Sequence, residues 1–189
     1  VVQHYGICSA ITNFEQFHQG MNFDDRAKCA AVLLDALYAD LVENLASVVR
    51  EEKGEEPKET GLLELIASRP DLFGDDAYYI DTSHLWSVVR FSSYVEDEAD
   101  LEKAIELTEY GKRLSSMYQY ENEAPFDDYY PDHKVYFEGI LAARRGDTEK
   151  ARECAEHFAA KGRRAAEAAE RGYPARGLLT VLARMDCYD

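Results

Sequence analysis

The stretch that decides the fold is residues 24–50, which read DDRAKCAAVLLDALYADLVENLASVVR. Apolar side chains recur in it every three or four positions, which is the spacing of one helix face. The members of this stripe are Cys29, Val32, Leu33, Ala36, Leu37, Leu41, Leu45, Val48 and Val49. Two acidic residues open the stretch and Arg50 closes it, as the helix dipole favours. Because Gly54 and Pro57 follow, we predict one long amphipathic helix that ends before them.

The helical period continues on both sides of this stretch, whereas alternating strand patterns are scarce. A preceding helix is predicted at 3–19, and its inward side chains are Ile7, Ile11, Phe14 and either Phe17 or His18. Further helices are expected at 59–68, 82–95, 99–115, 132–145, 148–170 and 175–186. The predicted fold class is all-α, with seven or eight helices as irregular antiparallel hairpins. Such hairpins stack as a short α-solenoid or a compact bundle.

The apolar stripes of four neighbouring helices predict the core of the second half of the chain. The side chains that we expect to be largely buried are Trp86, Val89, Leu101, Ile105, Ile140, Leu141 and Phe158. Between the last two of these helices, Gly146 is expected to end the first, and Asp147 is expected to cap the second.

The composition is that of an acidic globular protein. The chain has 189 residues, 46% of them hydrophobic, which suits one domain with a core. It carries 37 Asp and Glu against 21 Lys and Arg, a formal charge of −16, so nucleic acid and anionic membranes are poor partners. No apolar run of about 18 residues and no signal peptide are visible in the sequence.

We expect one helical domain over residues 1–189. Because the first residue is Val1 rather than Met, we expect the chain to start at a processed end or inside a longer parent chain, of which it would be a fragment. In this organisation, residues 1–75 hold the N-terminal helices. Residues 76–189 hold two repeat-like hairpins and a C-terminal helix.

The cysteines favour a cytoplasmic protein with reduced thiols. The four, Cys8, Cys29, Cys154 and Cys187, form no Cys-x-x-Cys pair and no zinc-ribbon spacing. Two of them, Cys29 and Cys154, lie on apolar helix faces, where a reduced thiol behaves as a small hydrophobic group. The alternative is a secreted domain with two disulfides.

Two stretches of the second half of the chain are alike. The first reads DAYYIDTSH at 76–84 and is followed, after a helix, by LEKA at 101–104. The second reads DYYPDH at 128–133 and is followed by TEKA at 148–151. Each has a Tyr-Tyr-x-Asp loop, a His at a helix start, an apolar helix and a second helix opening with Lys-Ala. We interpret them as an internal repeat of helix pairs.

The second pair resembles a tetratricopeptide repeat. Residues 146–151 read GDTEKA, like the turn and second helix of that family, and Gly139 falls where the family prefers a small residue. Residues 102–104, EKA, resemble the same turn. The resemblance covers about residues 82–165, with a period longer than the family's roughly 34 residues and with Phe158 at a usual Ala. It implies stacked hairpins that present a concave surface to another protein.

The repeated loops hold the first candidate binding residues, which are Tyr79, Asp81, His84, Tyr129, Tyr130, Asp132 and His133. In one interpretation, each Asp–His pair ligates a metal or acts as an acid/base pair, with the tyrosines as hydrogen-bond donors. In the other, Asp81 and Asp132 are helix N-caps and the tyrosines pack the connector. Capping explains both copies without catalysis.

A second candidate is the aromatic and acidic stretch at 118–130, which includes Phe126. Aromatic side chains anchor interfaces, and carboxylates steer basic partners. The alternative is a long connector that is packed down by Phe126 and Tyr130.

Other chemistry has little support in the sequence. Glu15 and His18 form a single Glu-x-x-His, whereas a di-iron bundle needs two such pairs. A nucleophile elbow and glycine-rich phosphate loops are missing. We therefore expect no metal and no cofactor.

These patterns favour a non-catalytic helical-repeat module for protein interaction or scaffolding over an enzyme. Its partner would be another protein or peptide, another part of the parent chain, or a second copy in a homo-oligomer. We expect neither nucleic acid nor a membrane as a partner. The alternative is a helical-bundle enzyme or metal-binding protein that uses the Tyr-Tyr-x-Asp-His loops.

Overall fold

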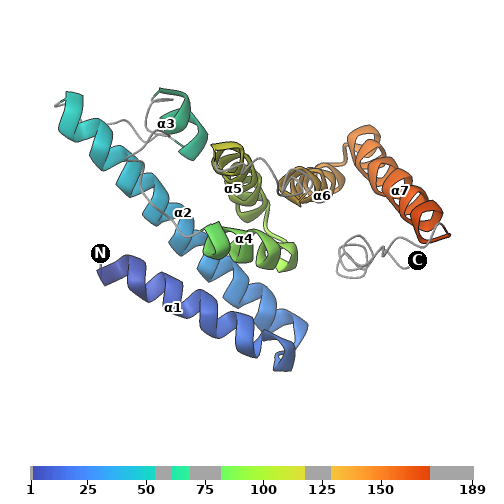
Figure 1. The fold of residues 1–189 in the computed structure, drawn as a ribbon, viewed down its shortest axis with the longest axis horizontal. Coiled ribbons are helices and arrows are strands. Elements are labelled where there is room, and N and C mark those ends of the chain that lie inside the picture. Colours follow the sequence, from blue (N-terminus) through green and yellow to red (C-terminus); the bar gives the residue numbers. More distant parts are fainter. Residues whose placement is uncertain (1, 54–60, 69–81, 118–128, 171–189) are drawn as a thin grey trace. The chain divides into compact units, whose positions relative to one another are not determined.

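The computed structural model describes residues 2–53, 61–68, 82–117 and 129–170 (Figure 1). They form seven α-helices and two 3-10 helices without a strand in the described ranges, so the fold class is all-α as predicted. None of the described helices is both long and apolar enough to cross a membrane. The chain divides into two compact units, Val1–Lys134 and Val135–Asp189. A single domain over 1–189 stays a prediction.

The helices follow the predicted order closely. Their bounds are α1 Val2–Phe17, η1 His18–Gly20, α2 Phe23–Lys53, α3 Leu62–Ser68, α4 Thr82–Phe91, η3 Ser92–Tyr94, α5 Glu98–Met117, α6 Tyr129–Arg144 and α7 Thr148–Glu170. The helix predicted at 175–186 lies outside the described residues.

Helix α2 is the element against which the rest of the first unit packs. Helices α1, α3, α4 and α5 and the 3-10 helix η3 all contact it. Its buried apolar side chains are Ala30, Leu33, Leu34, Leu37, Leu41, Leu45, Ala46 and Val49. The long helix predicted from the leucine stripe is therefore the central element of this unit.

The prediction that Val32 belongs to the buried stripe of α2 is wrong. Val32 is 66% exposed, whereas Leu34, which the stripe left out, is completely buried. Two positions along an α-helix correspond to a rotation of about 200°, so Val32 lies on the opposite side of α2 from Leu34. The buried arc is turned toward Leu34 because helices pack on α2 from several directions.

Helix α1 buries the predicted face, and the structure shows which of Phe17 and His18 is the last inward residue. Ile7, Ile11 and Phe14 are buried, and the Phe14 ring meets Phe91 of α4 edge to face at 4.6 Å between centroids. Of the two alternatives for the last position, His18 turns inward against Phe91, whereas Phe17 is 63% exposed.

The predicted core of the second half is confirmed in part. Val89, Leu101, Leu141 and Phe158 are buried, whereas three predicted members, Trp86, Ile105 and Ile140, are only half-buried. Helix α5 packs against α2, α3 and α4, which extends its buried arc to Leu107 and Tyr110 and leaves Ile105 at the edge. The Trp86 ring lies under the guanidinium of Arg90, 5.1 Å from its centroid.

Helix α6 begins three residues earlier than predicted, at Tyr129 rather than at residue 132. Residues 129–131 are therefore helical and do not belong to a loop, and Asp132 lies inside the first turn instead of at the N-cap. Proline is compatible with a first helical turn, where a backbone N–H has no partner within the helix, so Pro131 does not stop α6. An acidic side chain such as Asp132 is favourable there because it complements the helix dipole.

The turn between α6 and α7 is confirmed in detail. The Asp147 N–H donates to the Ala142 carbonyl at 2.9 Å, and the Gly146 N–H donates to the Ala143 carbonyl at 3.2 Å, which is a Schellman motif. Gly146 has φ 75°, the left-handed conformation that this motif needs and that glycine adopts at least cost. The Asp147 carboxylate then accepts the Lys150 N–H at 3.0 Å and caps α7.

Helices α6 and α7 approach each other closely at a glycine. A Cβ placed on Gly139 would lie 2.9 Å from the Cβ of Cys154, closer than two carbon atoms can pack. Burial raises the pKa of the Cys154 thiol, so this thiol stays protonated near neutral pH and acts as a packing group. The hairpin depends on the absence of a side chain at position 139.

Two glycine substitutions test this close approach. Gly139→Ala should lower the free energy of unfolding by about 1–3 kcal/mol, because the added methyl group overpacks the crossing. The control is Gly6→Ala in α1, where nothing lies within 4 Å of the added Cβ. That change should raise the free energy of unfolding by up to about 1 kcal/mol through helix propensity. Urea denaturation measures both, and equal stabilisation by the two changes would contradict the close approach.

A second pair of variants tests the corrected face of α5. Leu107→Ala should cost about 2–5 kcal/mol of unfolding free energy, because Leu107 is completely buried. Ile105→Ala removes a side chain of equal size from a half-buried position and should cost clearly less. The reverse order in a denaturant titration would show that the buried face is the one predicted from the sequence.

Candidate interaction site

The first copy of the Tyr-Tyr-x-Asp loop, with Tyr79 and Asp81, lies outside what the structure describes, and so does Phe126 of the aromatic and acidic stretch. Tyr129 and Tyr130 are the first two residues of α6, so in the second copy the Tyr-Tyr pair is helical. The roles predicted for these five residues stay predictions.

The described members of the two loops are His84, Asp132 and His133. His84 and His133 are half-buried, near the starts of α4 and α6, and Asp132 is buried with 7% exposure. Across the described ranges, no group of three or more His, Cys, Asp or Glu side chains is placed to hold a metal ion. In that part of the chain, the loop residues are therefore not assembled into a metal centre.

Glu15 of α1 and His18 of η1, the two residues of the Glu-x-x-His pair, make packing contacts. The Ser87 hydroxyl donates to the Glu15 carboxylate, and the Arg90 guanidinium approaches it at 3.5 Å. The Nδ1 of His18 lies 3.0 and 3.1 Å from the carbonyl oxygens of Phe14 and Glu15. Because both partners are acceptors, Nδ1 carries the hydrogen. The two side chains thus tie α1 to α4 and finish the last turn of α1.

A tyrosine and a glutamate from distant helices form a further polar junction of the first unit. The Tyr38 hydroxyl of α2 donates to the Glu106 carboxylate of α5 at 2.6 Å and accepts the Leu62 N–H at 3.3 Å. Burial, followed by the hydrogen bond to Glu106, raises the pKa of Tyr38 to about 12. A phenol with this pKa is not a base near neutral pH. Tyr38 therefore links α2, α3 and α5 and carries no evident chemistry.

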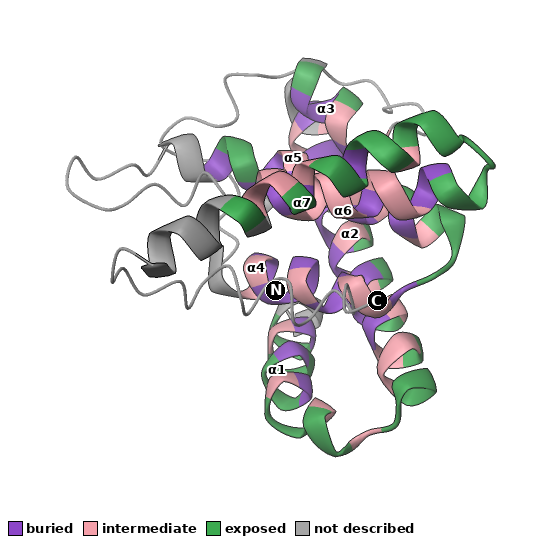
Figure 2. Ribbon diagram, turned by 90° about the vertical axis from the view of Figure 1, so that its right-hand side faces the viewer, coloured by how far each residue is buried: buried purple, intermediate pink, exposed green. Residues whose placement is uncertain are grey.

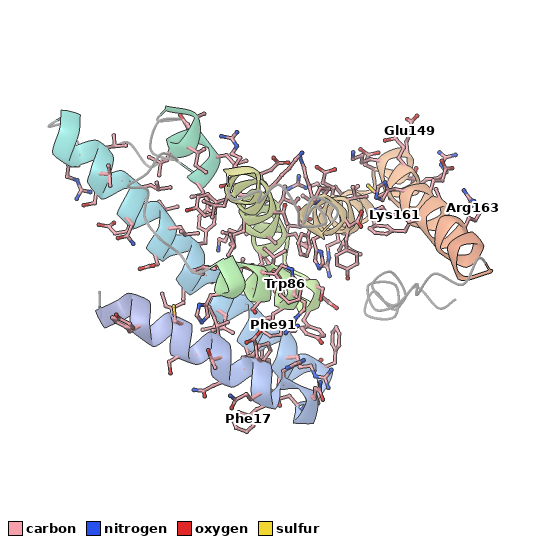
Figure 3. The ribbon with its side chains drawn as sticks, in the orientation of Figure 1. Phe17, Trp86, Phe91, Glu149, Lys161 and Arg163 are labelled. Atoms are coloured by element: carbon pink, nitrogen blue, oxygen red, sulfur yellow. The ribbon has the colours of Figure 1, made fainter. Side chains whose placement is uncertain are left out.

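Exposed large apolar side chains are confined to the first two helices within the described residues. They are Tyr5, Phe17, Phe23 and Val32, with 72%, 63%, 48% and 66% of their surface accessible. Phe17 and Phe23 flank the turn between α1 and α2, the exposed end of this hairpin in Figure 2. Figure 3 shows Phe17 pointing away from the neighbouring helices. We call residues 17–25 the α1–α2 tip.

Hydrogen bonds hold the backbone of the α1–α2 tip in one conformation. The Asn22 side chain accepts the Asp25 N–H at 2.9 Å and donates to the Asp25 carboxylate at 2.8 Å, which caps α2. The Arg26 guanidinium donates to the carbonyls of Met21 and Gln19 at 3.0 and 3.1 Å. The side chains of Asn22 and Arg26 therefore fix the turn through contacts within the same segment.

The Tyr94 ring of η3 holds the α1–α2 tip against the rest of the first unit. Its centroid lies 6.5 Å from that of His18 and 6.1 Å from that of Phe23, which it meets edge to face. The Arg26 guanidinium lies over the same ring at 5.8 Å. Phe23 is thus half-packed and half-exposed, whereas Phe17 has no aromatic neighbour among the described residues.

The repeated loops were found from a residue pattern that occurs twice, whereas the α1–α2 tip has no such pattern in the sequence. Helix period does not tell which end residues are exposed, and the pattern left Phe17 as an alternative inward residue. The available signal was the short connection between two predicted helices with a Phe on each side of it. Aromatic residues that border a short turn are candidates for exposure, because few neighbours can cover the end of a hairpin.

Comparison of the chain with known protein families, with curated proteins and with solved structures finds no significant match. The resemblance to tetratricopeptide repeats therefore rests on residues 82–165 of this sequence alone.

The Tyr38 junction predicts a loss of stability in alkali. The folded chain holds the phenolic proton more tightly than the unfolded chain, since the pKa rises from 10.0 to about 12. The resulting stabilisation is complete below pH 10 and is lost as the pH rises toward about 12. Tyr38→Phe should remove this part of the pH dependence. At neutral pH it should also cost about 1–3 kcal/mol, because Glu106 loses a donor and the Leu62 N–H loses an acceptor.

Urea denaturation across this pH range measures the effect, with Tyr5→Phe as the matched control. Tyr5 is 72% exposed, so removing its hydroxyl should leave the free energy of unfolding unchanged at neutral pH. An alkaline slope that is identical in the wild type and in Tyr38→Phe would contradict the junction.

Proposed function

We propose that this chain is a non-catalytic protein-interaction module that contacts its partner through the α1–α2 tip. The observation that carries the proposal is a turn fixed by Asn22 and Arg26 that exposes Phe17 and Phe23. Large apolar side chains that stay exposed on a folded surface mark interaction sites, and aromatic residues are frequent energetic anchors there.

The rigidity of the α1–α2 tip favours binding. A loop that must be ordered on association loses conformational entropy, and this loss weakens the complex. Here the helix cap at Asn22 and the two hydrogen bonds from Arg26 order the turn before any partner arrives. The partner therefore meets two aromatic side chains on a preformed support.

The scaffold part of the proposal draws on the α6–α7 hairpin. Its Schellman turn at Gly146 and the close crossing at Gly139 are features suited to helical hairpins that stack in repeats. They support a tetratricopeptide-like pair and, with it, a role in which one chain brings partners together. A cytoplasmic setting fits Cys8, Cys29 and Cys154, which form no disulfide in the described part of the chain.

Affinity capture with matched surface variants tests the function. The bait is the intact chain, and the α1–α2 tip variant carries Phe17→Ser and Phe23→Ser. Val32→Ser is the control, because it also replaces a large exposed apolar side chain, but outside the tip. We expect the wild type and Val32→Ser to capture the same partner from a lysate of the source cells. We expect the tip variant to lose that partner.

Unfolding curves of the three proteins provide the folding control. Exposed positions away from caps and cores, such as Phe17 and Val32, change stability by about 0.5 kcal/mol or less. Phe23→Ser also removes the edge-to-face contact with Tyr94 and should cost about 0.5–1.5 kcal/mol more, which still leaves the tip variant folded. Capture of the same partner in equal amount by the folded tip variant would contradict the proposed contact.

A further inference from the structure

We infer that the α1–α2 tip selects a partner segment whose apolar side chains are flanked by Lys or Arg. This inference rests on the proposed interaction function and adds the chemistry of the partner. It follows from the charges around Phe17 and Phe23.

The exposed charges of the α1–α2 tip are acidic. Residues 1–25 contain no Lys or Arg. Asp24 and Asp25 are exposed and directly follow Phe23. Asp25 shares its carboxylate with the Asn22 amide, whereas Asp24 has no hydrogen bond or ion pair within the described ranges. At least one carboxylate beside the aromatic pair is therefore available to a partner.

The nearest basic residue does not neutralise this surface. Arg26 is turned toward its own chain, where it donates to the Met21 and Gln19 carbonyls and lies over the Tyr94 ring. The first exposed cation is Lys28, one helical turn beyond Asp24 on α2, and it forms no ion pair with Asp24 within the described ranges. The outer surface of the tip thus combines aromatic side chains with carboxylates, which complements apolar side chains flanked by ammonium or guanidinium groups.

A second copy of this chain is a poor occupant of the α1–α2 tip. Pairing of two tips would bring the Asp24 and Asp25 carboxylates of both copies together. The whole chain carries a formal charge of −16, so two copies also repel each other at longer range. The same charge speeds the approach of a basic partner.

Two synthetic peptides test the inference against the intact chain. Both form an amphipathic helix with the same leucine face, and their polar positions are Lys in one and Glu in the other. Fluorescence anisotropy at low salt should show binding of the Lys peptide and at least about tenfold weaker binding of the Glu peptide. Phe17→Ser with Phe23→Ser should weaken binding of the Lys peptide by about tenfold or more.

A matched pair of charge variants separates local from general attraction. Asp24→Asn removes a carboxylate beside the aromatic pair and should weaken binding of the Lys peptide by about threefold or more at low salt. Glu43→Gln removes the same charge from another exposed position on α2 and should leave the affinity nearly unchanged. Equal effects of the two variants would mean that only the net charge attracts the peptide, and this would overturn the inference.

Three further outcomes would also overturn it. If the Glu peptide binds as well as the Lys peptide and both depend on Phe17 and Phe23, the proposed contact stands but its charge selection is wrong. If neither peptide depends on the two phenylalanines, the partner chemistry is wrong, and affinity capture still decides the proposed function. If sedimentation shows a dimer that the tip variant abolishes, the occupant of the tip is a second copy.

Discussion

The burial of one face of α2 is the constraint on which the rest of the first unit depends. Leu34, Leu37 and Leu41 are at most 1% exposed, because α1, α3, α4, α5 and η3 all pack on this helix. An isolated amphipathic helix of 31 residues would leave its apolar face in contact with water. Covering this face stabilises α2, and the same buried contacts hold the neighbouring helices in place. Polar links are then added between the packed helices, such as the one from Tyr38 to Glu106.

The same arrangement explains how an exposed turn can be well ordered. Phe14 and His18 at the end of α1 pack on Phe91, and Tyr94 contacts both His18 and Phe23. The two helix ends that form the α1–α2 tip are thus fixed by the core beneath them. The outer side chains remain uncovered because the hairpin ends there. A surface that is rigid and apolar at once is suited to recognising another protein.

Local signals predicted the helices well, whereas exposure was less predictable. The turn at Gly146 and Asp147 was read correctly because glycine and aspartate act there through the backbone of their own neighbours. The start of α6 was missed because Pro131 usually marks a loop but also suits a first helical turn. Ile105 was placed inward by its spacing, and only the packing of several helices on α5 shows that Leu107 is the better-buried residue. The α1–α2 tip was not predicted because helix period does not show which side chains at the end of a hairpin stay uncovered.

Site-specific photo-cross-linking tests most directly whether the partner lies against the α1–α2 tip. A photoreactive phenylalanine analogue replaces Phe17 in one protein and Val32 in another, two positions with similar exposure of 63% and 66%. The yield of cross-linked partner after irradiation is the quantity measured. We predict a strong adduct from position 17 and little from position 32. Equal yields, or a larger yield from position 32, would contradict it.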